Sequence, residues 1–127
     1  MFHLAIPTHD LNLAKEFFGD GLGLVIGREQ NSYVIVNFFG HQVVCHLAPD
    51  EIESNPKMYP RHFGLIVIQE QKYEELLMSA REKKLNFFKH DFKRFQGKES
   101  EHRSFFLLDP SNNLIEFKWY KKQSAIF

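Results

Sequence analysis

The 127-residue sequence has little of several features that would narrow its class. Cys45 is its only cysteine, so no disulfide can form within the chain, which is consistent with a reducing compartment. No apolar stretch approaches the roughly 20 residues that a membrane-spanning helix needs. Polar residues begin at His3, too early for the apolar centre of a signal peptide. We therefore expect a cytoplasmic protein that does not enter a membrane.

The chain also lacks an excess of either charge. Its 16 basic and 16 acidic residues give a formal net charge of zero. Binding to nucleic acid or to anionic lipid depends on clustered lysine and arginine, so we expect neither partner. The length suits one domain, or two small modules that share a core.

Phenylalanine, in contrast, is abundant, with 14 residues against a single tryptophan. Simple core packing is the plainer interpretation of so much aromatic area. The alternative is that some of these rings line an apolar cavity that takes a small molecule.

The same order of elements is predicted twice along the chain. In residues 1–47, apolar periodicity predicts a strand, a helix ending near Gly19, and three strands. Residues 48–61 hold three of the five prolines and are predicted to be a connector. In residues 62–127 the order recurs. The expected strands are 2–7, 24–29, 32–39, 42–47, 62–68, 86–95, 103–108 and 113–120, with the second helix at 70–84. We predict an α+β fold of two βαβββ modules within one domain, each sheet curled into part of an incomplete barrel around a shared cup.

Four polar side chains lie at matching places in the two modules. His3 and His62 each open the first strand of a module, and His46 and Glu116 each lie in the last strand. Strand alternation places all four on the less apolar face. Imidazole and carboxylate groups on such a face suit Fe, Mn, Ni, Co or Zn as divalent ions.

Each of the four also has a plainer interpretation. A strand histidine is more often a hydrogen-bonded structural residue than a ligand. A carboxylate in an apolar strand needs a partner, and for Glu116 an ion pair with Arg103 or Lys118 would serve as well as a metal. The repeat raises the joint case for a metal site.

These features resemble the vicinal-oxygen-chelate superfamily, which includes glyoxalase I, extradiol dioxygenases, fosfomycin-resistance enzymes and bleomycin-binding proteins. The resemblance rests on His3, on the HFGL run at 62–65, and on the DPSNNLIEF run at 109–117. It implies that His3, His62 and Glu116 bind a divalent metal, and that a second chain often contributes, so a homodimer is expected. His46 is either a fourth ligand or a catalytic acid–base group.

Two departures from the family pattern bear on the reaction. Glyoxalase I usually offers a carboxylate on the fourth strand, where we assign His46, and this weakens the case for its isomerisation. Extradiol dioxygenases use two histidines and one carboxylate, which His3, His62 and Glu116 supply, but usually in a longer chain. A family glycine is replaced by Asn112 or Asn113.

Three hypotheses follow. The first is a metal-dependent enzyme of glyoxalase or dioxygenase type that binds a small substrate through two neighbouring oxygens. The second is a metal-free, bleomycin-resistance-like protein that binds a drug or metabolite. The third is a protein that keeps only the fold. Among the other residues, His41 and Lys118 are weaker candidates for substrate contact. We expect His9, His90 and His102 at the surface. Cys45 is expected to pack in the core.

Overall fold

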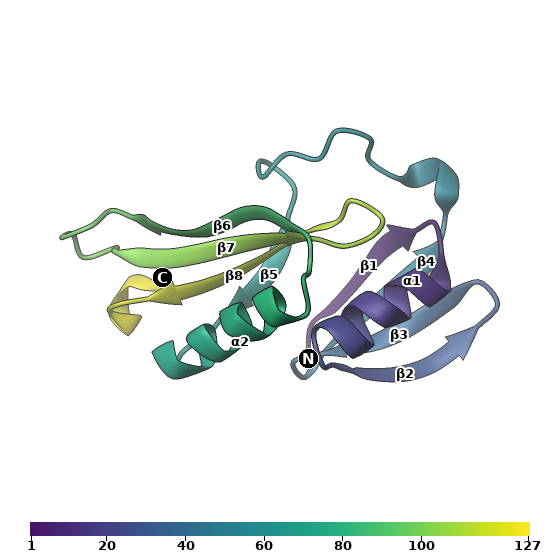
Figure 1. The fold of residues 1–127 in the computed structure, drawn as a ribbon, viewed down its shortest axis with the longest axis horizontal. Coiled ribbons are helices and arrows are strands. Elements are labelled where there is room, and N and C mark those ends of the chain that lie inside the picture. The colour runs from purple at the N-terminus through teal and green to yellow at the C-terminus, as the bar shows by residue number, and fades with distance from the viewer. The chain divides into compact units, whose positions relative to one another are not determined.

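The computed structural model describes residues 1–127, and the chain divides into two compact units. The first unit comprises Met1–Pro56 and Asp109–Asn113, and the second comprises Lys57–Leu108 and Leu114–Phe127. Each contains one open, four-stranded mixed sheet with a helix on one face (Figure 1). The predicted α+β fold of two βαβββ modules is confirmed.

The first unit follows the predicted order of elements closely. Its strands pair in the order β1-β4-β3-β2, with β1 parallel to β4. The elements are β1 (His3–Thr8), α1 (Leu11–Lys15), a π-helical turn η1 (Glu16–Gly21), β2 (Val25–Gln30), β3 (Tyr33–Phe38) and β4 (His41–Leu47).

Helix α1 begins where Asp10 caps it. The Asp10 Oδ1 atom accepts hydrogen bonds from the backbone N–H groups of Asn12 at 2.8 Å and Leu13 at 3.0 Å. Ala14 and the two phenylalanines of η1, Phe17 and Phe18, are buried at helical spacing. These residues fix which face of the first sheet is covered by helix.

The connector contains one short 3-10 helix, η2 (Pro49–Glu51), and otherwise forms no helix or strand up to β5. Its prolines cannot donate backbone hydrogen bonds to a sheet, which explains the absence of regular pairing. The prediction of a connector at 48–61 agrees with this stretch of the chain.

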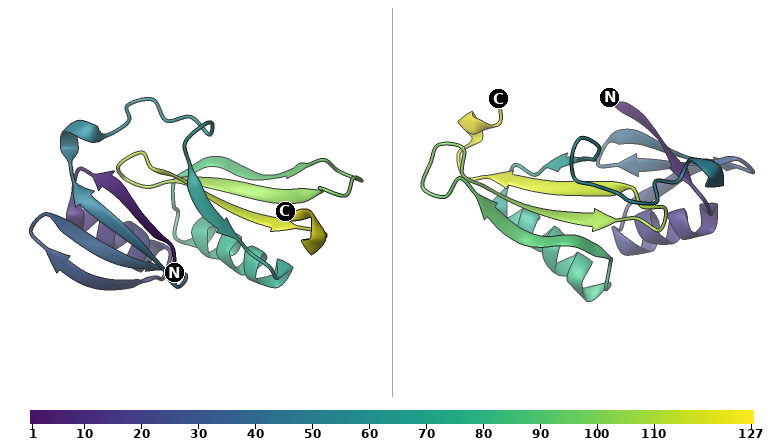
Figure 2. Two further views of the ribbon diagram at one scale, coloured as in Figure 1. Left: turned by 180° about the vertical axis from the view of Figure 1, so that it is seen from behind. Right: turned by 90° about the horizontal axis from the view of Figure 1, so that it is seen from above.

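The second unit repeats the arrangement, with strand order β5-β8-β7-β6 and β5 parallel to β8 (Figure 2). Its elements are β5 (Phe63–Ile66), α2 (Glu70–Glu82), β6 (Phe87–Arg94), β7 (His102–Leu108), β8 (Leu114–Tyr120) and a short 3-10 helix η3 (Gln123–Ala125). None of the helices in the chain has both the length and the apolar character needed to cross a membrane.

The second sheet has an apolar face against α2 and a more polar face opposite it. Tyr73 of α2 contacts the Phe105 ring, which stacks on Phe117. All three side chains are fully buried. Because side chains alternate along a strand, Phe106 and Glu116 point to the other side, which we call the helix-free face.

Candidate metal centre

His62 and Glu116 meet on the helix-free face of the second sheet. His62 directly precedes β5 and Glu116 lies in β8, the strand that pairs with it. The His62 Nε2 atom is 3.1 Å from Glu116 Oε2, and the two side chains are 24% and 11% exposed. The structure therefore brings together two of the four predicted site residues.

A backbone carbonyl sets the orientation of the His62 ring. The Nδ1 atom lies 2.5 Å from the Met58 carbonyl oxygen. A carbonyl only accepts hydrogen bonds, so Nδ1 carries the proton and donates it. In the neutral imidazole the lone pair is then on Nε2, directed at the Glu116 carboxylate.

This arrangement matches what a metal-binding pair requires. Two ligands at right angles, each about 2.1 Å from a metal, lie about 3.0 Å apart, close to the observed separation of His62 and Glu116. Metal-binding histidines usually donate their second ring N–H to an oxygen acceptor, as His62 does to Met58. The donor set and its geometry fit a divalent metal.

The pair formed by His62 and Glu116 has one cationic and two aromatic neighbours. Lys118 Nζ lies 3.4 Å from Glu116 Oε1, so the alternative ion pair predicted from the sequence is also present. Phe106 packs edge-on to the His62 ring at 5.2 Å, and Tyr59 does so at 5.9 Å. A pocket of about 260 Å³ opens here, and His62, Glu116 and Lys118 are among its lining residues.

The structure gives the reason for a glycine at position 64 of the HFGL run, which was not evident from the sequence. It pairs with Glu116 across β5 and β8. A Cβ atom at this position would lie 1.8 Å from the Glu116 carbonyl oxygen, far inside contact distance. The absence of a side chain lets the two strands approach closely and fixes the backbone that carries Glu116.

In the first unit, His3 is held much as His62 is. Its Nδ1 atom lies 2.6 Å from the Gln42 side-chain oxygen, across the paired strands β1 and β4. With the amide oxygen as acceptor, Nδ1 carries the proton and Nε2 keeps the lone pair. Gln42 was not among the predicted site residues, because nothing in its neighbourhood marked it in the sequence.

His46 lies further along β4 on the same face as His3. It pairs with Pro7 and Tyr33, its ring centre is 5.9 Å from that of Tyr33, and it is exposed. Four residues separate Gln42, the partner of His3, from His46, so the positions lie about 13 Å apart along the strand. Within the first unit His3 and His46 do not lie together.

The strand register corrects the predicted equivalence of His46 and Glu116. Two residues beyond His62, Gly64 pairs with Glu116. Two residues beyond His3, Ala5 pairs with Val44. Val44 therefore occupies the position of Glu116 in the repeat, and His46 occupies that of Lys118.

The turn in the DPSNN run carries structure of its own. Asp109 Oδ1 accepts from the backbone N–H groups of Ser111 at 2.9 Å and Asn113 at 2.8 Å. Asn112 takes a left-handed conformation, with φ of 61°, in place of the family glycine. Ser111 Oγ lies 3.1 Å from Thr8 Oγ1 at the end of β1. The run thus positions a turn in the first unit, and it directly precedes the strand that carries Glu116.

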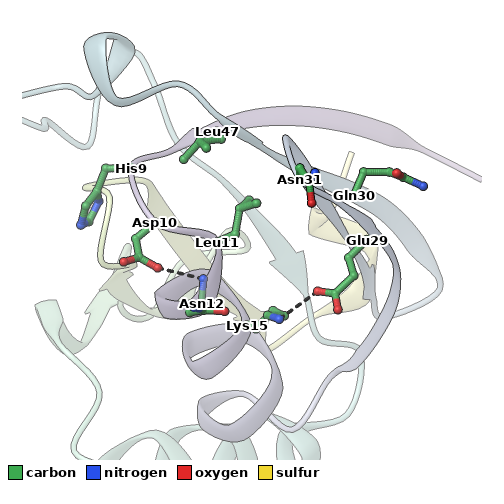
Figure 3. A pocket seen from close by; sticks show the side chains of 9 residues that line it. All are labelled: His9, Asp10, Leu11, Asn12, Lys15, Glu29, Gln30, Asn31 and Leu47. Atoms are coloured by element: carbon green, nitrogen blue, oxygen red, sulfur yellow. Dashed lines mark hydrogen bonds and ion pairs between the residues drawn. The ribbon is translucent and has the colours of Figure 1, made fainter.

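A second pocket, of about 600 Å³, lies in the first unit beside the start of α1 (Figure 3). The two charged side chains that face each other there, Lys15 and Glu29, form an ion pair at 2.9 Å. Asp10 is occupied as the helix cap. His9 is exposed, as expected, and its Nδ1 atom lies 2.8 Å from Ser111 Oγ. The pocket contains no set of unpaired groups that would define a site.

Two further expectations can be compared with the structure. Cys45 is fully buried in β4, and burial, with a smaller contribution from the Asp109 charge, raises the pKa of its thiol to about 12, which agrees with a packing role. His102 was expected at the surface but is buried, because Phe95 and Tyr120 pack against its ring. Within either unit, no group of three or more His, Cys, Asp or Glu side chains could hold a metal by itself.

Comparison with known proteins identifies the family. The model of the glyoxalase/bleomycin resistance protein/dioxygenase superfamily matches residues 1–117, and the chain belongs to this superfamily. The comparison with curated proteins gave no match.

Solved structures agree with this assignment. A glyoxalase/bleomycin resistance protein/dioxygenase from Alicyclobacillus acidocaldarius is 39% identical, with a TM-score of 0.97 over 100% of this chain and 96% of its own. The fosfomycin resistance protein FosX from Listeria monocytogenes (16%, TM-score 0.77, 99% and 97% covered) shares the fold. Lactoylglutathione lyase from Agrobacterium tumefaciens (16%, TM-score 0.71, 95% and 94% covered) shares it as well.

Proposed function

We propose that the protein is a metal-dependent enzyme of glyoxalase or dioxygenase type that binds a small substrate through two neighbouring oxygens. The ligands in this proposal are His62, Glu116 and His3, the last from the same chain or from a partner. The observation that carries it is the position of His62 Nε2, 3.1 Å from a Glu116 carboxylate oxygen, with Nδ1 of the same ring held by the Met58 carbonyl.

The lone pair of a neutral His62 Nε2 and the Glu116 carboxylate would repel each other at this distance. A cation must lie between or beside them, and the candidates are a proton on His62, the ammonium of Lys118, or a metal. Of these, the metal is the one that would also use His3, the matching histidine of the first unit, whose Nδ1 is bound to an oxygen acceptor while Nε2 has no partner.

The metal would act as a Lewis acid that stabilises negative charge developing on a substrate oxygen. The chain's own residues have separate tasks. The Met58 carbonyl and Gln42 orient the two histidines, and Gly64 fixes the backbone of Glu116. Phe106 packs edge-on against the His62 ring.

The register bears on the class of reaction. Val44 at the position that repeats Glu116 leaves a three-residue ligand set, which keeps positions open for substrate. We propose His46 as an acid–base group near the substrate rather than the counterpart of Glu116, and as a fourth ligand only if substrate binding draws it in. Substrate screening distinguishes the lyase, isomerase and dioxygenase reactions of this proposal.

Metal-free binding of a small molecule is the second candidate, favoured by the stacked rings of Phe92 and Phe106 on the helix-free face, 6.3 Å apart. The two functions separate on treatment with a chelator. Ligand binding that survives metal removal supports the binding protein, whereas an enzyme of the proposed type loses turnover.

The experiment that tests the proposal is elemental analysis of the purified protein, followed by anomalous scattering from a crystal. One equivalent of a transition metal bound by Glu116 and His62 supports it. Absence of metal, together with no affinity for Fe, Mn, Ni, Co or Zn, overturns it. The same crystal shows whether His3 belongs to the same chain, as in a monomer, or to a partner in the homodimer that we propose.

A cytoplasmic location is part of the proposal and is supported by the single buried thiol of Cys45.

A further inference from the structure

The start of β1 is held by two consecutive residues of β4, His41 and Gln42. β1 lies at the edge of the first sheet and has β4 as its only partner strand there. The Gln42 N–H donates to the Phe2 carbonyl oxygen at 2.9 Å, and the Gln42 side-chain oxygen lies 2.6 Å from His3 Nδ1. The Phe2 N–H donates to His41 Nδ1 at 3.1 Å. Three contacts thus converge on Phe2 and His3.

A tight turn between β3 and β4 places His41 within reach of Phe2. Phe39 and Gly40, the two central residues of the turn, both have positive φ, of 53° and 90°. Hairpins with a two-residue turn of type I′ require positive φ at both positions. The Asn37 side-chain oxygen accepts the Gly40 N–H at 2.8 Å and stabilises the turn. His41 is therefore fixed at the first position of β4.

The hydrogen bond with Phe2 determines the tautomer of His41. A backbone N–H can only donate, so the Nδ1 atom of His41 must offer its lone pair. The neutral ring then carries its proton on Nε2. This is the reverse of His3 and His62, whose Nδ1 atoms face oxygen acceptors. The Nδ1 atom of His41 is therefore used within the fold and is not available to a substrate.

We propose that His41 is a positioning residue for the metal centre, which fixes the start of β1 through the Phe2 N–H and thereby keeps His3 at Gln42. The inference rests on the proposed function, in which His3 is a ligand, and adds a residue that acts through it. Without the His41 contact, Phe2 keeps one backbone hydrogen bond to β4, and its side chain is 62% exposed. Strand ends with so few buried contacts open at little cost in free energy, and opening here separates the His3 ring from its acceptor.

Variants of the acceptor and of the donor test this hydrogen bond. His41→Leu removes the acceptor, whereas His41→Asn keeps an acceptor oxygen close to the position of Nδ1. Phe2→Pro removes the donor because proline has no N–H, and Phe2→Leu is the matched control that keeps it. His90→Leu replaces an exposed histidine of β6 in the second unit and is the control for loss of an imidazole.

The affinity of the full chain for Zn(II) is measured by calorimetry. His41→Leu and Phe2→Pro should each weaken it by about fivefold, the value of a typical intramolecular hydrogen bond. His41→Asn, Phe2→Leu and His90→Leu should bind as the unchanged protein does. The double variant of His41→Leu with Phe2→Pro should be no weaker than either single variant, because both remove the same bond. An equal loss in His41→Asn, or an additive loss in the double variant, overturns the proposal.

The metal-free protein shows whether His41 acts on His3 or only stabilises the fold. In the long-range ¹H–¹⁵N spectrum His41 is expected as the Nε2–H tautomer. His41→Leu should lose the His3 Nδ1–H resonance, and His41→Asn should retain it. A contact that only stabilises the fold would lower the midpoint of thermal unfolding and leave that resonance in place.

The two measurements together separate this role from the metal centre. If Zn(II) does not bind but the His3 resonance responds as described, the metal centre fails and the positioning of His3 by His41 stands. If Zn(II) binds but His41 is the Nδ1–H tautomer, or the His3 resonance is unchanged in His41→Leu, the positioning role fails and the metal centre stands.

Discussion

The two units share a fold but differ in the side chains at one matching strand position. In each, a histidine at the start of the first strand has Nδ1 bound to an oxygen acceptor. Nε2 of His3 has no partner, whereas Nε2 of His62 lies 3.1 Å from Glu116 Oε2. In the second unit the paired strand then offers Glu116, whereas the first unit offers Val44 at the same register position. The duplicated scaffold thus has one of the proposed metal ligands in the first unit and two in the second.

The largest effect is expected from removing the carboxylate that distinguishes the units. Glu116→Gln keeps the shape of the side chain but loses a charged ligand, so metal affinity should fall by more than the roughly 10–100-fold typical of outer-shell changes. The matched variant in the first unit, Val44→Thr, should leave affinity unchanged. Calorimetric titration with Zn(II) measures both. Similar losses in the two variants would refute the asymmetry.

The second contrast lies in the residues that pair with Val44 and Glu116 on the neighbouring strand, which are Ala5 and Gly64. Ala5 in the first unit tolerates the Cβ atom that Gly64 cannot, because Gly64 faces the Glu116 carbonyl. Gly64→Ala should lower the free energy of unfolding by about 1–3 kcal/mol through overpacking.

The reverse change, Ala5→Gly, should lower it by roughly 0.5–1 kcal/mol through chain entropy. Urea unfolding measures both variants, and metal affinity should fall only in Gly64→Ala. An unchanged Zn(II) affinity in folded Gly64→Ala would show that the close approach does not position Glu116.

The third contrast concerns how each histidine is oriented. His62 relies on a backbone carbonyl, which mutation cannot remove, but His3 relies on the Gln42 side chain. Gln42→Leu should weaken metal binding by about 10–100-fold, as loss of an outer-shell partner does. Gln42→Glu retains an oxygen acceptor and should recover most of the affinity. If both variants bind metal as the unchanged protein does, His3 is not a ligand.

The smallest effects are expected from two aspartates, half-buried Asp91 and buried Asp109, whose pKa values move in opposite directions. Burial alone would raise the pKa of Asp91, but hydrogen bonds from Arg103 and Tyr73 and the Arg103 charge hold it below the ordinary value. Burial raises the pKa of Asp109 in the first unit, and its three hydrogen bonds only partly offset this.

The signs for stability follow from these directions. Asp91 contributes stability above its unfolded pKa, and this is lost as pH falls through the lower folded value. Asp109 acts in the opposite sense, because the folded protein holds its proton more tightly and stability declines as pH rises towards the folded value. Carbon-13 NMR titration of the carboxyl groups should place Asp91 below, and Asp109 above, the usual value of about 3.9. The reverse order would contradict the assigned burial and pairing.

Much of the fold followed from the sequence because strand alternation and helical spacing are local signals. His3, His62 and Glu116 were placed on the correct faces by alternation alone. Register is a different matter. A shift of two residues keeps every side chain on its face, so the pattern could not distinguish Val44 from His46 as the partner of Glu116 in the repeat.

Other parts of the candidate site left no local signal. The Met58 carbonyl lies in the proline-rich connector, and any residue type can supply a carbonyl. Gly64 was visible in the HFGL run, but its reason is the approach of β8, about 50 residues later in the chain.

The most direct test of the central claim is the long-range ¹H–¹⁵N NMR spectrum of the histidine side chains, recorded with and without Zn(II). Without metal, His62 and His3 are expected as Nδ1–H tautomers, because Met58 and Gln42 accept their protons. One equivalent of Zn(II) should then shift the Nε2 resonances of both and leave their Nδ1–H protons in place. Nε2 resonances that do not respond to Zn(II), or a Nε2–H tautomer for His62, would contradict the account.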